Sequence, residues 1–190
     1  MSGKLVIFSA PSGAGKTTIV HHLLKLDLNL EFSISACSRD KRADERDAVD
    51  YFFLGIDTFK DKIDSKEFLE WEEVYPNQFY GTLKSEVEKM LSEEKNVIFD
   101  VDVVGGLNIK DAYKDLALSI FVMPPSIEQL KERLLKRSTE SEASVTNRVE
   151  KAASELKYAG QFDEILMNDN MEDALKKAET MVERFLNNGI

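Results

Sequence analysis

The fold is decided by one stretch near the N-terminus, Leu5-Val6-Ile7-Phe8-Ser9-Ala10-Pro11-Ser12-Gly13-Ala14-Gly15-Lys16-Thr17. Its first five residues form a short apolar run that predicts a buried strand, and residues 17–26 have a helical pattern. The glycines between them let the backbone curl so that successive N–H groups point at a bound anion. The positive end of the following helix dipole adds to this attraction. The stretch therefore predicts a strand, an anion-binding turn and a helix.

The turn matches the P-loop pattern from its second glycine onward, and Ala10 stands where the pattern has its first glycine. In such a loop the lysine, here Lys16, places its charge on the β- and γ-phosphates, and the hydroxyl of Thr17 can bind Mg²⁺. A tight turn without a ligand is the alternative, and the strand before the turn and the helix after it argue against that. We expect ATP phosphates to contact Ala10, Pro11, Ser12, Gly13, Ala14, Gly15, Lys16, Thr17 and Thr18.

Two aspartates follow a second apolar run, Val97-Ile98-Phe99. Asp100 stands at the end of this predicted strand, where a carboxylate can hold the water shell of Mg²⁺ beside the P-loop. Asp102 lies two residues further and shares its strand face. An aspartate at a strand end more often caps the next turn, but the P-loop reverses that preference. We therefore expect a magnesium site at Thr17 and Asp100, the latter through water.

Apolar runs alternate with helical patterns along most of the chain. Strands are predicted at residues 5–9, 32–37, 97–101, 118–123 and 164–167, and helices at 17–26, 107–113, from 126 onward and at 171–187. Such alternation is typical of a parallel sheet that is covered by helices on both faces. The predicted fold class is therefore α/β.

Two segments interrupt this alternation. Residues 35–83 predict a small inserted α+β lobe, with antiparallel strands at 51–54, 68–74 and 79–82 around a helix at 58–64, and with Phe68 and Trp71 in its core. Residues 139–146 form a polar stretch between two helices, which suits a lid. We expect a single domain over residues 1–190, made of a core (1–34, 84–125 and 158–190), the lobe (35–83) and a lid region (126–157).

Composition limits the partners and the compartment. The net charge of −10 argues against a nucleic-acid binder, and the short N-terminal apolar run suits neither a signal peptide nor a membrane span. Cys37 is the single cysteine, so no intramolecular disulfide is possible, and a reducing, cytoplasmic location is expected. The oligomeric state stays open between a monomer and a homodimer.

Further motifs resemble the guanylate kinase family of nucleoside monophosphate kinases over nearly the whole chain. In chain order they are Ser12-Gly13-Ala14-Gly15-Lys16-Thr17, Ser38-Arg39-Asp40-Lys41-Arg42, Asp50-Tyr51-Phe52-Phe53, Tyr80-Gly81-Thr82, Asp100-Val101-Asp102-Val103-Val104-Gly105 and Asn168-Asp169. Lid arginines of that family fall at Arg133, Arg137 and Arg148.

The resemblance implies direct phosphoryl transfer from ATP to GMP or dGMP, with Mg²⁺. It implies that the GMP phosphate is held by Arg39, Arg42, Tyr51 and Tyr80, and that guanine is recognised by Ser35, Glu70, Thr82 and Asp102. Catalysis would depend on Lys16, Arg39, Arg133, Arg137 and Arg148, and Asn168 would lie near the adenine. A carboxylate such as Glu70 suits guanine, because N1–H and the exocyclic amine are neighbouring donors.

Two alternatives remain open. A kinase of the same fold could use another acceptor, such as AMP or a sugar phosphate, although Ser35, Glu70 and Asp102 argue against it. Alternatively, the chain could resemble guanylate-kinase-like peptide-binding scaffolds that have lost catalysis, although Lys16, Thr17 and the lid arginines argue against that.

Overall fold

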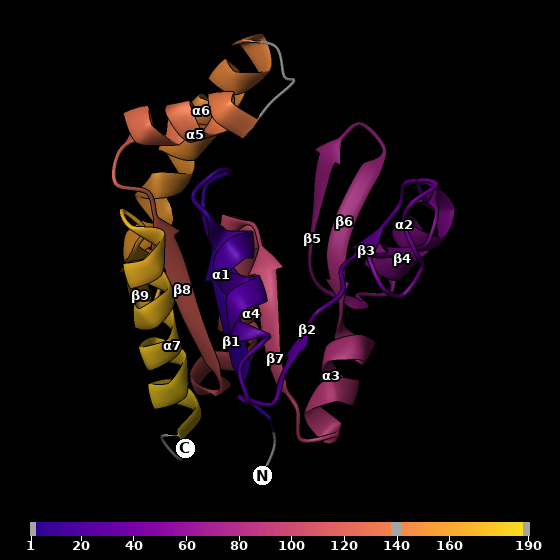
Figure 1. Cartoon of the computed structure of the whole chain (residues 1–190). Coiled ribbons are helices and arrows are strands. Elements are labelled where there is room, and N and C mark those ends of the chain that lie inside the picture. Colours follow the sequence, from indigo (N-terminus) through magenta and orange to yellow (C-terminus); the bar gives the residue numbers. More distant parts are fainter. Residues whose placement is uncertain (1–2, 138–141, 188–190) are drawn as a thin grey trace.

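One parallel sheet forms the centre of the computed structural model, which describes residues 3–137 and 142–187 but not the side chains at 136, 137 and 142–144. Its strands lie in the order β2 (Leu30–Phe32), β7 (Asn96–Val101), β1 (Leu5–Ser9), β8 (Ala117–Met123) and β9 (Glu164–Met167). Every pairing in this sheet is parallel (Figure 1).

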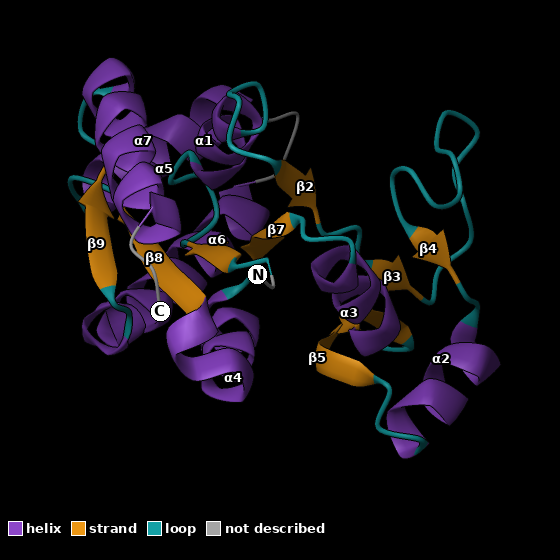
Figure 2. Ribbon diagram, turned by 90° about the horizontal axis from the view of Figure 1, so that it is seen from below, coloured by secondary structure: helices purple, strands orange, loops and turns teal. Residues whose placement is uncertain are grey.

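Helices cover both faces of this sheet. The residues of β1 are therefore all buried, and they alternate between two cores. Val6 and Phe8 pack with α1 (Lys16–Leu23), α5 (Ile127–Arg137), α6 (Glu142–Glu155) and α7 (Met171–Asn187). Leu5 and Ile7 pack with α3 (Lys84–Ser92) and α4 (Val103–Tyr113). Figure 2 shows the strands between α1 and α7 on one side and α4 on the other. The predicted α/β class is thereby confirmed.

A second, smaller sheet lies beside the first, in the order β4 (Phe52–Phe53), β3 (Ala36–Cys37), β6 (Gln78–Leu83) and β5 (Phe68–Tyr75). The helix α2 (Ile56–Asp64) packs on it through Phe59, whose ring stacks on Phe68 with centroids 4.3 Å apart. This cluster has no member in common with the cores of the parallel sheet. The small sheet therefore has its own core.

The strand predicted at residues 32–37 is two strands in different sheets. β2 ends at Phe32 beside β7, and β3 begins at Ala36 beside β6. Ser33 still donates its N–H to the carbonyl of Ile98 (3.0 Å), so the chain crosses from one sheet to the other over the next residues. The prediction that all strands of the inserted segment are antiparallel is also wrong, because β4 pairs with β3 in parallel.

Trp71 does not belong to the core of the small sheet, although Phe68 does. The indole is 46% exposed, whereas Phe68 is buried. Side chains alternate along β5, and the inward position next to Trp71 is taken by the buried carboxylate of Glu70. The bulky aromatic therefore faces outward, and the core prediction for it is wrong.

Two short 3₁₀ helices, η1 (Lys114–Leu116) and η2 (Leu156–Gln161), precede β8 and β9. The polar stretch predicted at residues 139–146 falls partly outside the described residues, and from Glu142 onward it belongs to α6 rather than to a loop. Within residues 3–137 and 142–187, no helix has the length and apolar character needed to span a bilayer.

Candidate active site

The loop between β1 and α1 depends on two glycines. Gly13 and Gly15 have φ angles of 89° and 98°, which side chains other than glycine's rarely allow. A Cβ atom on Gly15 would lie 2.4 Å from Nδ2 of Asn168, so the space is also closed. Asn168 is buried there and donates from Nδ2 to the carbonyl of Ala14 at 2.6 Å. The loop is thus held by the backbone conformation of its two glycines and by Asn168, the residue that follows β9.

Three side chains meet where β1 and β7 end side by side. Nζ of Lys16 lies 2.7 Å from Oδ1 of Asp100, and Oγ1 of Thr17 donates to Oδ2 of the same carboxylate at 2.7 Å. Lys16 also donates to the carbonyl of Val101 at 2.5 Å. The parallel register pairs Phe8 with Asp100, which explains why residues so distant in sequence come together.

A cleft of about 350 Å³ opens above this loop. Its walls are residues 10–17, two aspartates of β7's end and three residues of α6, namely Asp100, Asp102, Arg148, Lys151 and Glu155. The P-loop amides and the cations at its walls make this cleft suited to a polyphosphate.

A second cleft of about 200 Å³ lies between the two sheets. It is lined by Ser35, Tyr51, Glu70, Glu72, Val74, Tyr80, Gly81, Asp100, Val101 and Asp102. Both clefts therefore share Asp100 and Asp102. A molecule in one cleft can meet a molecule in the other at this shared wall.

Glu70 is the most perturbed acid of the second cleft. Its side chain is buried, and Oε1 accepts a hydrogen bond from Oγ1 of Thr82 at 2.6 Å. Burial raises the pKa of Glu70 from 4.5 to about 7, with a smaller contribution from Asp102, while the bond from Thr82 acts in the opposite direction. A Cβ on Gly105 would lie 2.8 Å from Oε2, so the glycine leaves room for this carboxylate.

Asp102 caps the helix that follows it. Its Oδ1 accepts from the backbone N–H groups of Val104 (2.8 Å) and Gly105 (2.9 Å) at the start of α4. The capping role considered for a strand-end aspartate thus applies to Asp102. Asp100, by contrast, contacts the P-loop side chains Lys16 and Thr17.

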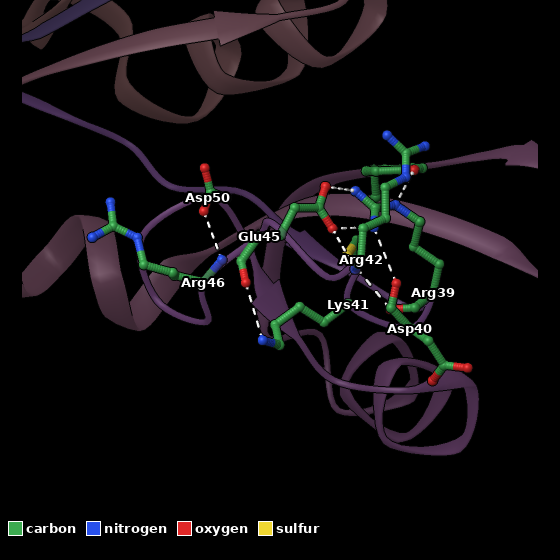
Figure 3. Close-up of polar contacts among 9 residues, drawn as sticks. Arg39, Asp40, Lys41, Arg42, Glu45, Arg46 and Asp50 are labelled. Atoms are coloured by element: carbon green, nitrogen blue, oxygen red, sulfur yellow. Dashed lines mark hydrogen bonds and ion pairs between the residues drawn. The ribbon is translucent and has the colours of Figure 1, made fainter.

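Figure 3 shows a charged loop in which both carboxylate oxygens of Glu45 contact Arg39. Arg39 also contacts Tyr80, which lines the second cleft. Nη1 and Nη2 of Arg39 lie 2.7 and 2.6 Å from the two oxygens of Glu45. The carboxylate raises the pKa of Arg39, and the guanidinium lowers the pKa of Glu45 to about 2. Glu45 was not predicted from the sequence, in which its one indication is that it stands six residues after Arg39, a side chain that is 14% exposed.

The structure places the other predicted residues as follows. Ser35, Tyr51 and Tyr80 line the second cleft, and Arg148 lines the first. Thr82 is buried behind Glu70, whereas Thr18 and the side chain of Arg42 are exposed and line neither cleft. Arg133 donates to the carbonyl of Asn168 at 3.0 Å. Arg137 ends α5, and its side chain lies outside what the structure describes.

Comparison with known proteins gives consistent results. The family model described as guanylate kinase matches residues 2–185. A guanylate kinase of Bacteroides thetaiotaomicron is 53% identical over 189 residues, covering 98% of this chain and 92% of that protein. One from Thermotoga maritima is 44% identical and covers 96% of this chain and 87% of its own length.

A solved structure supports the fold. The crystal structure of guanylate kinase from Anaplasma phagocytophilum superposes with a TM-score of 0.74, covering 98% of this chain and 88% of that one, at 22% sequence identity. At that identity the likeness shows the fold alone, and the family rests on the model match and the closer relatives. The predicted family is confirmed, and this chain belongs to the guanylate kinase family.

Proposed function

We propose that this chain transfers the γ-phosphoryl group of ATP to GMP or dGMP, with the triphosphate in the first cleft and the acceptor in the second. The observation that carries the proposal is the wall shared by the two clefts at Asp100 and Asp102. Two nucleotides seated on either side of it would bring their phosphates end to end. Guanylate kinase is also the name of the relatives that match at about half identity over nearly the whole chain.

The triphosphate would lie against the backbone of residues 10–18, whose N–H groups from Ser12 onward can donate to it, and against Lys16. Thr17 and Asp100 supply hard oxygen donors within 2.7 Å of each other, which fits Mg²⁺ held partly through water. Bound there, the ion would neutralise charge on the transferred phosphoryl group. Arg133, Arg137 and Arg148 would close over the phosphates from α5 and α6, so we propose residues 126–157 as the lid.

Guanine would be recognised in the inserted lobe, residues 35–83. The ionised carboxylate of Glu70 can accept from N1–H and from the exocyclic amine, and the hydroxyl of Ser35 can donate to O6 or N7. Thr82 donates to Glu70 and so holds the carboxylate in place. Adenine has no donor at N1, so the buried carboxylate of Glu70 would keep only its bond from Thr82, and AMP should therefore be rejected.

Transfer itself needs no side-chain base, because the phosphate of GMP is already a nucleophile. The protein contributes by positioning both phosphates and by stabilising charge through Lys16, Arg148 and Asn168-supported loop amides. Closure of lobe and lid would exclude water and suppress hydrolysis of ATP.

A coupled assay of ADP release with a panel of acceptors tests the proposal. We expect turnover with GMP and dGMP that exceeds turnover with AMP by at least about a hundredfold. Faster turnover with AMP or a ribose phosphate would refute the guanine assignment. No turnover with any monophosphate would instead favour a binding scaffold.

A further inference from the structure

Lys151 is a cation of the first cleft that the sequence motifs do not include. It lies on α6, three residues after Arg148 and four before Glu155, so these side chains share one face of the helix. All three line the first cleft. The face of α6 that borders this cleft therefore carries a lysine between an arginine and a glutamate.

Two acids flank the ammonium group of Lys151, and they come from different parts of the molecule. Nζ of Lys151 lies 3.5 Å from Oε1 of Glu72, which is on β5, and 3.9 Å from Oε1 of Glu155 on its own helix. Glu72 lines the second cleft, whereas Lys151 lines the first. The ammonium group therefore lies where the two clefts meet, and the proposed function places the transferred phosphoryl group at this junction.

The contacts between Lys151 and the two acids are loose. Both distances exceed the roughly 2.7–2.9 Å of a close charge-assisted hydrogen bond, whereas Nζ of Lys16 lies 2.7 Å from Asp100. Lys151 and Glu72 are also 56% and 43% exposed, and an ion pair that is open to water contributes little to stability. Exchange of the carboxylate of Glu72 for a phosphate oxygen therefore costs little.

Glu155 explains why a cation belongs at this position. Its side chain is only 14% exposed, and burial raises its pKa, while Lys151 acts in the opposite direction. A carboxylate on the wall of a polyphosphate cleft repels the ligand unless a cation lies beside it. The charge of Lys151 therefore suits the cleft whether the ammonium contacts an acid or a phosphate.

We propose that Lys151 is a further catalytic residue: its ammonium group leaves Glu72 and donates to an oxygen of the phosphoryl group during transfer. In that step the bond from the γ-phosphorus to the bridging oxygen of ATP breaks, and a bond to an oxygen of the acceptor phosphate forms. ADP leaves with the electron pair of the broken bond, and Lys151 keeps its protons while it stabilises the charge. This inference rests on the proposed function, because it takes both nucleotides to be bound as described there.

A different role for the same ion pair would be a latch that joins α6 to the small sheet. A latch is lost whichever partner is changed, whereas a contact with the phosphoryl group needs Lys151 and not Glu72. The place of Lys151 on the wall of the first cleft and its long distances to both acids favour the contact with the phosphoryl group.

The test is Lys151→Gln, with Lys157→Gln as the matched control. Lys157 lies in η2, is exposed, lines neither cleft and loses the same charge when it is changed. Rapid-quench measurement of a single turnover at saturating ATP and GMP gives the rate of transfer without product release. We expect Lys151→Gln to lower this rate by about tenfold or more, the usual effect of losing a charge-assisted hydrogen bond.

Two further variants show whether the charge itself is needed. Lys157→Gln should keep the wild-type rate of transfer within about twofold, because its charge lies outside both clefts. Lys151→Arg should keep most of the rate, because it retains a cationic donor. A loss in Lys151→Arg as large as that in Lys151→Gln would overturn the proposal.

Glu72→Gln separates the contact with the phosphoryl group from the latch, because it breaks the ion pair and keeps the lysine. We expect it to lower the rate of transfer by no more than about threefold. A loss in Glu72→Gln as large as that in Lys151→Gln, or larger, would indicate a latch and would overturn the proposal. An unchanged rate in Lys151→Gln would overturn it as well.

The failure of this inference differs from that of the proposed function. Wild-type protein that turns over no GMP contradicts the function itself. Wild-type protein that turns over GMP, together with an unchanged rate in Lys151→Gln, contradicts only the role of Lys151. Thermal melting of each variant establishes that folded proteins are compared, and the exposure of Lys151 predicts nearly unchanged melting temperatures.

Discussion

Substitution of Glu70 by glutamine should remove a pH-dependent loss of stability. The pKa of this carboxyl is about 7 in the folded chain against 4.5 for an ordinary glutamate. Below about pH 4.5 the group is protonated in both states, and its environment costs nothing. As the pH rises from about 4.5 through 7, the unfolded chain ionises freely, whereas the folded chain can ionise only by carrying a buried charge. Stability is therefore lost between these two pH values.

The size of the effect follows from the shift. A difference of about 2.5 units corresponds to about 3 kcal/mol, all of it lost by about pH 8. Glu70→Gln keeps the shape and can still accept the bond from Thr82, but it cannot ionise. Urea unfolding of both proteins between about pH 4 and 8.5 should therefore show wild type losing about 3 kcal/mol relative to the variant.

Binding of GMP should couple to the same proton. The proposed contacts to N1–H and to the amine need the ionised carboxylate, so wild-type affinity for GMP should fall about tenfold per unit below pH 7. The phosphate of GMP also titrates near pH 6. The Glu70→Gln variant provides the control, because its weaker binding of GMP still depends on that phosphate but no longer on a carboxyl at position 70. Calorimetry at about pH 6 and pH 8 measures the ratio of the two affinities.

Two results would refute this reasoning. Parallel stability profiles for wild type and Glu70→Gln would mean that the carboxyl is not held neutral in the folded chain. An affinity ratio that does not change with pH would mean that GMP does not select the ionised form, and that Glu70 acts on the lobe's structure instead.

Three other substitutions have defined outcomes. Lys16→Ala should lower kcat by at least about a hundredfold with little change in melting temperature, because Nζ contacts Asp100 and a carbonyl at the cleft rather than the core; unchanged turnover would contradict its role. Gly105→Ala should raise the KM for GMP at least about tenfold, because the new Cβ displaces Oε2 of Glu70, from which it would lie 2.8 Å, and an unchanged KM would argue against Glu70 as the guanine acceptor. Ala48→Gly should stabilise the chain by about 0.5–1 kcal/mol in urea unfolding, because Ala48 has a φ of 57°; a loss of stability would show that the methyl group contributes more than the strained backbone costs.

Much of the parallel sheet could be predicted because its central strands, β1, β7 and β8, are largely buried on both faces and contain apolar runs. The helix α3 was missed, since Lys84–Ser92 begins without a side-chain cap and has few apolar residues. Trp71 was misplaced because hydrophobicity alone does not decide which face of an edge strand is buried. Its face follows instead from the neighbouring Glu70, whose buried carboxylate takes the inward position.

The arrangement of the candidate site could be predicted where a single motif contains both the residues and the backbone turn that places them, as in the P-loop. Glu45 was not predicted, because nothing in the sequence shows that Arg39 is only 14% exposed or that Glu45 is its partner. The same holds for Gly105 in α4. A side chain there would collide with the carboxylate of Glu70, which comes from β5 of the small sheet. Interactions between segments that are far apart in sequence require the fold before they can be seen.

The strand order explains why two clefts share one wall. β7 lies between β1, which leads into the P-loop, and β2, which leads into the crossing to the small sheet. The carboxyl ends of parallel strands open on the same edge of the sheet, so the end of β7 borders both sites at once. Asp100 contacts Lys16 and Thr17, while Asp102 caps α4 beside Glu70, and both aspartates line both clefts. Exchanging the neighbours of β7 would separate the clefts even with every side chain retained, and so the topology, as much as the motifs, makes transfer between two nucleotides geometrically possible.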